Sequence, residues 1–348
     1  MSPVFPVPNT SFVSERLVNG SIRMVPVVMA LMGAGLLVVL ILGTGLDAVR
    51  DALAPVGWGI VPIILSHVLP MLLDMAAWRL LFIGSAPSPG ALFGMRWIGE
   101  AVNNLLPVAQ VGGELARVRL AMLAGVETSR ASATVLADVT FGALTQMLFA
   151  LIGLGLLLTT HQVGSVIPVL SGLLLFGCGI YAFYWIQRGR GLGMVWRWAG
   201  VILPKQEWVV KLGEIGPFQE TLERIYADRA VAGWSCFWRL AGWFAGAAEI
   251  WLCLWFFGVP VGWTDVIILE SLSQAGRSAA FTVPGAIGVQ EAGFVALGMV
   301  LGLDPSTALA LGLIRRARDL ALGLPALAVW SGIEARRSTG IARQDGAR

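Results

Sequence analysis

Charged residues are scarce in this chain. Asp, Glu, Lys and Arg make up 13% of its 348 residues, whereas hydrophobic residues make up 57%. A soluble domain carries about 25% charged residues, so this chain lacks the charge to cover a solvated surface. Several apolar runs exceed the roughly 20 residues that a helix needs to cross the hydrocarbon core of a bilayer. The composition excludes an ordinary soluble protein and predicts an all-α polytopic membrane protein.

Cysteine and histidine are also few. The cysteines Cys178, Cys236 and Cys253 are scattered through apolar runs without a CxxC pair, so we expect them to pack in the core. The histidines His67 and His161 have no companions at metal-ligand spacing, and an embedded titrating group is an alternative role for His67. No P-loop, nucleophile elbow, HExxH motif or dinucleotide fingerprint occurs. We therefore expect no metal, no cofactor and no ATP-driven step.

The net charge is small, but its distribution is informative. A formal charge of +3 does not suggest a nucleic-acid partner. Arginine and lysine cluster at residues 117–130 and 188–229 and recur at both ends of the chain. By the positive-inside bias these regions face the cytoplasm, which predicts a multi-pass protein with cytoplasmic N- and C-termini.

One segment of the sequence occurs twice. Pro284–Glu291 (PGAIGVQE) matches Pro107–Glu114 (PVAQVGGE), 177 positions earlier. The match continues without a gap over residues 106–138 and 283–315, where 11 of 33 positions are identical. Chance would give about 3 identities in a chain this rich in Leu, Ala and Gly, so we infer an internal repeat. An apolar segment interrupted by Pro and Gly at equivalent places in two halves is typical of a transporter binding site.

The apolar runs predict six full transmembrane helices and two re-entrant hairpins. The predicted helices are residues 24–46, 57–82, 131–158, 165–186, 230–258 and 306–332. The predicted hairpins, residues 91–123 and 263–301, are broken by Pro and Gly and are too polar for plain spans. Irregular backbone is tolerable at membrane depth only where protein or a water-filled cavity covers it.

These elements form two halves in an inverted-topology repeat. Residues 24–158 are the first repeat and residues 165–332 the second, and each holds two spans, a hairpin and a further span. The charge counts give the two halves opposite orientations. Outside them we expect a disordered cytoplasmic tail at 1–23, a cytoplasmic or interfacial insert at 187–228 and a basic cytoplasmic tail at 333–348.

Ionisable residues within the hairpins and spans need a partner or a function, because each costs about 2.5–3.5 kcal/mol at the centre of a bilayer. The repeat aligns Glu100 with Arg277 and Asp138 with Arg315. We therefore expect these two pairs of opposite charge to lie close to the interface between the hairpins. Ion pairs that lock the hairpins together, without any ligand, are an equally good interpretation.

Polar residues near the two broken-helix tips complete the candidate site. Such tips leave unpaired N–H groups that favour an anionic headgroup, or their carboxylates could carry coupling protons. Arg315 and Arg318, on one predicted helix, suggest a clamp for a phosphate group. The alternative is that these arginines pair with Asp319, Glu291 or Glu270. The candidate substrate-binding residues are Glu100, Asn103, Asn104, Gln110, Glu114, Asp138, Gln274, Arg277, Gln290, Glu291, Arg315 and Arg318. The candidate structural residues of the tips are Pro107, Gly112, Gly113, Pro284, Gly285 and Gly288.

Three motifs carry a resemblance to a known family. Gly112–Arg117 (GGELAR), Pro284–Glu291 and Arg315–Asp319 (RRARD) resemble the flippase-like transmembrane region of the lysylphosphatidylglycerol synthases, over roughly residues 24–335. The chain looks most like the stand-alone members associated with hopanoid biosynthesis. The resemblance implies a bacterial inner-membrane protein that moves a lipid between leaflets or delivers it to an exporter.

Two departures from that family bear on function. The synthases carry a C-terminal aminoacyl-transferase domain, whereas this chain ends at Arg348, so we expect no lysyl transfer and no enzymatic activity. The second copy of the family's motif usually reads Pro-Gly-Gly, whereas this chain has Ala286 in the third position. Alanine is small enough for close approach, so we expect the tip to be preserved.

The first hypothesis is a lipid translocator whose two hairpin tips enclose a headgroup. Its expected partners are membrane lipids and proteins of lipid biosynthesis or export, and a hopanoid, a phospholipid and a glycolipid all fit. The alternative is a non-transporting scaffold that holds lipid-synthesising enzymes together, for which the ion pairs would be purely structural. An intramembrane enzyme acting through Glu114 and Glu291 is weaker, because no nucleophile or metal cluster accompanies them.

Overall fold

The computed structural model describes residues 46–106, 108, 111–161, 215–280, 283 and 286–345, and single residues at 38, 39, 42, 174, 177, 178 and 181. For residues 337–345 it describes the backbone alone. Every regular element within these residues is a helix, which confirms the all-α prediction. The predicted tail 1–23 and most of the predicted spans 24–46 and 165–186 and of the predicted insert 187–228 lie outside the described residues.

The first half begins with a broken helix followed by a helical hairpin. The helices α2 (Leu46–Leu53), η1 (Ala54–Gly59), α3 (Ile60–Ser66) and α4 (Val68–Leu80) follow one another directly, and His67 separates the last two. Helix α5 (Pro89–Leu105) starts with Pro89 and is capped by the side chain of Ser88, a favourable combination at a helix N-terminus. Then come α6 (Gly112–Leu123) and the long α7 (Thr128–Thr160).

The second half ends, like the first, with a 17-residue helix, a 12-residue helix and a long helix. Helices α11 (Ile215–Ala227) and α12 (Arg229–Phe256) are joined at Asp228, whose carboxylate caps α12. They lead to α13 (Trp263–Ala279), the short α14 (Val289–Val300) and α15 (Pro305–Asp345). Helix α15 continues beyond residue 332, the predicted end of the last span.

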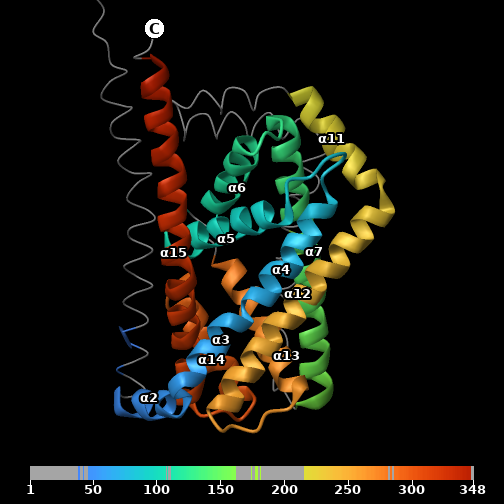
Figure 1. Cartoon of the computed structure of the whole chain (residues 1–348). Coiled ribbons are helices and arrows are strands. Elements are labelled where there is room, and N and C mark those ends of the chain that lie inside the picture. Colours follow the sequence, from blue (N-terminus) through green and yellow to red (C-terminus); the bar gives the residue numbers. More distant parts are fainter. Residues whose placement is uncertain are drawn as a thin grey trace, which may run out of the picture.

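Helices of equal length occupy corresponding places in the two halves. Helices α5 and α13 each have 17 residues, and α6 and α14 each have 12. The aligned glycines Gly125 and Gly302 both follow the short helix with positive φ angles, 86° and 78°, a conformation that costs glycine little. Helix α7 packs on α13 of the other half, α15 packs on α5, and α4 crosses α12. In Figure 1, α5 and α6 lie in the upper part of the molecule, and α13 and α14 in the lower part.

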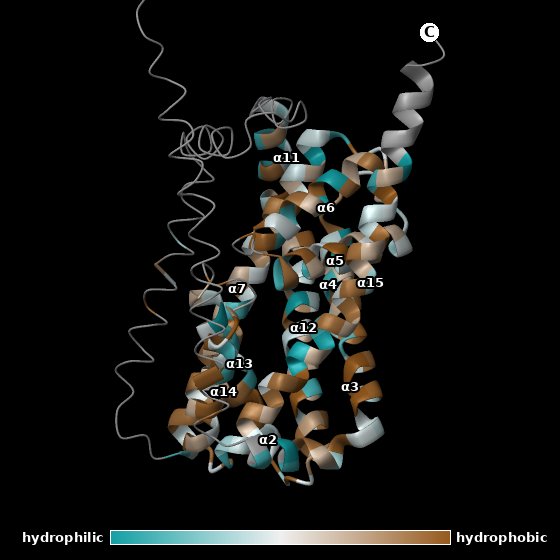
Figure 2. Cartoon of the chain, turned by 90° about the vertical axis from the view of Figure 1, so that its left-hand side faces the viewer, coloured by the Kyte–Doolittle hydropathy of each residue, from teal (hydrophilic) through white to brown (hydrophobic). Residues whose placement is uncertain are grey.

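The described helices differ in whether they are long and apolar enough to cross a membrane. The stretches Ala54–Leu80 and Thr128–Thr160 are long and apolar enough to do so alone. Helix α7 exposes a row of leucines, among them Leu144, Leu148 and Leu151, as expected of a surface in contact with lipid. In Figure 2, hydrophilic residues interrupt the middle turns of α12, within otherwise largely hydrophobic surroundings. Helices α6 and α14, at 12 residues each, span only about 18 Å of the roughly 30 Å hydrocarbon core.

The predicted tips of both hairpins are only partly described. Pro107, Gln110, Pro284 and Gly285 lie outside the described residues. Ala286 is fully buried and has a φ of 49°, a left-handed conformation that favours glycine. Gly288 follows with a φ of 77°, and its N–H donates to the Glu291 carboxylate at 2.7 Å, which closes the first turn of α14.

The first hairpin is held by a close contact between two glycines. A Cβ atom on Gly113 would lie 2.1 Å from the carbonyl oxygen of Gly99. The N–H of Gly113 donates to the Asn103 side chain at 2.7 Å. Helices α5 and α6 therefore touch backbone to backbone at the start of α6.

Candidate functional site

A cavity of about 290 Å³ lies between the two halves. Its walls come from α4, α5 and α6 on one side and from α12, α13 and α15 on the other, and His67 lies at its edge between α3 and α4. Opposite charges are equally numerous around it. The charged side chains that line it, besides His67, are Asp74, Glu100, Glu114, Glu249, Glu270, Arg96, Arg117, Arg277, Arg315 and Arg318.

One group of these charges, the Asp138 cluster, is centred on a fully buried carboxylate. Asp138 on α7 lies 2.6 Å from Arg117 on α6, 2.7 Å from Arg239 on α12 and 3.1 Å from Arg96 on α5. Asp74 on α4 pairs with Arg96 and, at 3.1 Å, with Arg239. The cluster thus joins four helices of the first half to α12 of the second.

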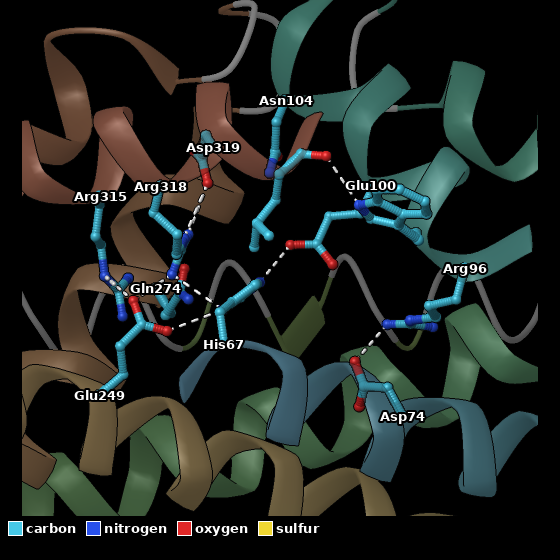
Figure 3. A network of polar contacts seen from close by, with 12 residues as sticks. His67, Asp74, Arg96, Glu100, Asn104, Glu249, Gln274, Arg315, Arg318 and Asp319 are labelled. Carbon is cyan, nitrogen blue, oxygen red and sulfur yellow. Dashed lines mark hydrogen bonds and ion pairs between the residues drawn. The ribbon is translucent and has the colours of Figure 1, made fainter. Parts of the chain in front are cut away.

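The other group, the Glu249 cluster, lies on the opposite side of the cavity (Figure 3). Glu249 on α12 pairs with Arg318 on α15 and lies 2.9 Å from Nδ1 of His67. Arg315 pairs with Glu270 on α13 at 2.6 Å, and Arg318 pairs with Asp319 at 2.7 Å. Removing charges from water is costly unless each has a close partner, and these contacts supply the partners.

The two clusters repeat one ion pair with its charges reversed. Arg96 is the eighth residue of α5 and Glu270 the eighth residue of α13. Arg96 pairs with Asp138 on α7, and Glu270 pairs with Arg315 on α15. Since the repeat aligns Asp138 with Arg315, the same helix-to-helix link occurs in both halves with opposite polarity.

The protein-family model described as the lysylphosphatidylglycerol synthase TM region matches residues 24–326. The chain belongs to this family. No curated protein and no solved structure matches it. Membership confirms the family predicted from the motifs, and together with the apolar helices it identifies a multi-pass helical membrane protein with a lipid-related role.

Most of the substrate-binding residues predicted from the sequence lie at the cavity of this lysylphosphatidylglycerol synthase TM region. Those that line it are Glu100, Asn103, Asn104, Glu114, Gln274, Arg277, Arg315 and Arg318. Asp138 is buried beside it. Gln290 and Glu291 are buried elsewhere, and Glu291 pairs with Arg316 at 2.7 Å besides capping α14. Glu114, which the repeat aligns with Glu291, has a different location: it lines the cavity and pairs with Arg117 at 2.6 Å.

Glu100 and Arg277 both line the cavity, but each contacts a partner other than the aligned residue. Glu100 lies 2.6 Å from Nε2 of His67, and Arg277 donates to the side chain of Asn104 at 2.6 Å. The reason is a difference in connection length. One residue separates α5 from Pro107, whereas four separate α13 from Pro284. Three extra residues shift the register by almost one helical turn, so the counterpart of Arg277 on α5 is Asn103 and not Glu100.

Although the sequence suggests His67 as a titrating group and Glu270 as an arginine partner, several site residues were not among the candidate substrate-binding residues. They are His67, Asp74, Arg96, Arg117, Arg239, Glu249 and Glu270. Each is a charged or titratable residue within an apolar stretch, and such residues are functional candidates by default in a membrane protein. Some of their partners lie far away in the sequence, as with Arg239 and Asp138, 101 positions apart. Within the described residues, no three His, Cys, Asp or Glu side chains come together as metal ligands would.

Arg277 differs from the other arginines of the cavity. Arg96, Arg117, Arg315 and Arg318 each pair with at least one carboxylate. Among the described residues, no carboxylate oxygen lies within 4.0 Å of Arg277, whose one described hydrogen bond goes to the Asn104 amide. Its guanidinium group keeps the capacity to bind an anion.

Proposed function

We propose that this protein is a lipid translocator whose cavity receives the headgroup while the acyl chains stay in the bilayer. The observation that carries the proposal is the position of the cavity. It is lined by charged side chains from both halves of a membrane protein, and its outer helices expose leucine and aromatic residues. An interface between two repeats near the midplane is where secondary transporters bind substrate.

The proposal includes a topology. In it, α5–α6 and α13–α14 are re-entrant hairpins that enter from opposite sides of a bacterial inner membrane, and six further helices cross it with both termini in the cytoplasm. The short lengths of α6 and α14 favour this arrangement, since a 12-residue helix cannot cross the bilayer. The exchanged packing of α7 on α13 and α15 on α5 fits an inverted repeat that rocks about the cavity.

The cavity favours a headgroup with an anionic part. Arg277 supplies a cation without a carboxylate partner, and Asn104 beside it supplies a polar amide. A phosphate or carboxylate would accept charge-assisted hydrogen bonds from the guanidinium group. The sequence resemblance to hopanoid-associated members adds a hopanoid derivative as the second lipid class. In this proposal the protein carries out no chemical step on the lipid, and its partners are the lipid and proteins that make or export it.

Leaflet exchange in proteoliposomes tests the proposal. Fluorescent phosphatidylglycerol, fluorescent phosphatidylcholine and a labelled hopanoid would each be incorporated, and an impermeant quencher would report exposure in the outer leaflet. We expect wild-type protein to accelerate exchange of the anionic probe over protein-free vesicles. Exchange at the protein-free rate for all three probes would reject the translocator.

The scaffold remains the second candidate because so many of the embedded charges are already paired. Each of the five carboxylates that line the cavity has a basic partner, which suits a rigid, non-transporting core. A scaffold would retain lipid-synthesising enzymes in a pull-down and would show no exchange. A translocator would show exchange whether or not such enzymes are bound.

A further inference from the structure

His67 occupies a singular position in the fold. It separates α3 from α4, and its ring reaches both halves of the molecule (Figure 3). Nε2 lies 2.6 Å from the Glu100 carboxylate on α5, and Nδ1 lies 2.9 Å from the Glu249 carboxylate on α12. When both nitrogens carry a proton, the ring donates to both carboxylates and joins α5 to α12.

The surroundings of Nδ1 also suit the neutral ring. Nη1 of Arg318 on α15 lies 3.1 Å from Nδ1 and donates to it when that nitrogen has lost its proton. A neutral imidazole has one donor and one acceptor nitrogen. In that state Nε2 still donates to Glu100, Nδ1 accepts from Arg318, and Glu249 loses its bond to the ring. Nδ1 therefore has both an acceptor and a donor within reach, so that both protonation states find hydrogen-bond partners.

The charged groups around the ring come from three helices packed against this region. They are Glu100 from α5, Glu249 from α12, and Arg318 with Asp319 from α15. Arg318 also pairs with Glu249 and with Asp319, so it stays neutralised in either state of the ring. Asp74 on α4 and Asp138 on α7 are held by arginines of the Asp138 cluster. A proton at Nδ1 thus exchanges one contact of the ring for another: it makes the bond to Glu249 and breaks the bond from Arg318.

We propose that His67 binds the proton that couples lipid movement to a proton gradient, with Nδ1 as the site that gains and loses it. The proposal rests on the proposed translocator function. His67 is 15% exposed and lines the cavity, whereas Glu249 is 1% exposed, so the proton exchanges with water in the cavity through the ring. The proton taken from one side closes the link between α5 and α12, and its release to the other side opens it.

The first experiment imposes a pH gradient across proteoliposomes that contain fluorescent phosphatidylglycerol. With one proton coupled to one lipid, each pH unit shifts the steady-state ratio of probe between leaflets by up to about tenfold. We expect this shift for wild type and for His161→Gln, which removes the other histidine of the chain, and no shift for His67→Gln. His161 lies at the end of α7 and bonds Asp265 at 2.8 Å, away from the cavity.

Two results separate the coupling from the translocator itself. Wild-type exchange that is fast and indifferent to the gradient would overturn the coupling and leave the translocator intact. Absence of exchange under any gradient would reject the translocator and the coupling with it.

A second measurement does not depend on transport or on a variant at His67. In His161→Gln protein labelled with ¹⁵N-histidine, His67 is the one histidine left. We expect its Nδ1 resonance in lipid nanodiscs to move from the imidazolium to the neutral position as pH rises, and Glu249→Gln to lower the pH at which this happens. A ring that stays in one protonation state between about pH 5 and 10, a range that brackets the usual histidine pKa, would overturn the proposal.

Discussion

Arg96 on α5 and Glu270 on α13 occupy the same place in two equal helices and carry opposite charges. Each pairs with its opposite on the long helix that follows, Arg96 with Asp138 and Glu270 with Arg315. The two halves have therefore kept a common packing scheme while the charges in it have been exchanged. A cavity between such halves presents both signs of charge, and a polar headgroup can find donors and acceptors in it.

The Glu270–Arg315 pair offers a test of how much these buried contacts stabilise the fold. Glu270→Gln leaves Arg315 with Glu249 at 3.9 Å as its nearest described carboxylate. Breaking a buried ion pair from one side costs about 3–5 kcal/mol, so we expect a clear fall in the thermal midpoint in detergent. Glu270→Gln with Arg315→Gln should recover part of the loss, because no charge is then left unpaired between them. A double variant less stable than the single one would contradict this explanation.

The contact between Gly99 and Gly113 predicts a strong effect of one methyl group. Gly113→Ala would place a Cβ atom 2.1 Å from the Gly99 carbonyl oxygen, so α5 and α6 must move apart. We expect a large loss of thermal stability or of folded yield. Gly94→Ala on α5 is the matched control, since a Cβ atom there meets nothing within 4 Å, and it should be neutral or raise stability by up to about 1 kcal/mol. Equal behaviour of the two variants would refute the close contact.

A substitution at the tip before α14 is expected to raise the thermal stability rather than lower it. Ala286 has a φ of 49°, and a left-handed conformation costs a residue with a Cβ atom about 1–2 kcal/mol. Ala286→Gly removes that cost. The gain in stability is partly offset because glycine has greater conformational freedom in the unfolded chain. We expect the thermal midpoint to rise slightly, and Gly288→Ala, at a φ of 77°, to lower it. A lower midpoint for Ala286→Gly would show that the methyl group packs better than its conformation costs.

Much of the architecture was predictable from the sequence, but the pairing within the site was not. Helices and membrane character follow from long apolar runs, and the repeat follows from identities such as Gly125 and Gly302. Glu100 and Arg277 both line the cavity, but their partners could not be predicted from an alignment without gaps, which ignores the three extra residues before Pro284. His67 and Arg239 have partners more than 100 positions away in the sequence, and such contacts depend on how helices cross.

The most direct test of the account concerns Arg277, because the proposed headgroup site depends on its unpaired guanidinium group. Exchange of fluorescent phosphatidylglycerol would be compared for wild type, Arg277→Lys, Arg277→Gln and Arg79→Gln, an exposed arginine on α4 outside the cavity. A hydrogen bond to a charged group contributes about 1.5–3 kcal/mol, so Arg277→Gln should slow exchange roughly 10- to 100-fold. Arg277→Lys should keep part of the rate, and Arg79→Gln all of it. Wild-type exchange by Arg277→Gln, with the protein folded and inserted to the same extent, would contradict a headgroup site in this cavity.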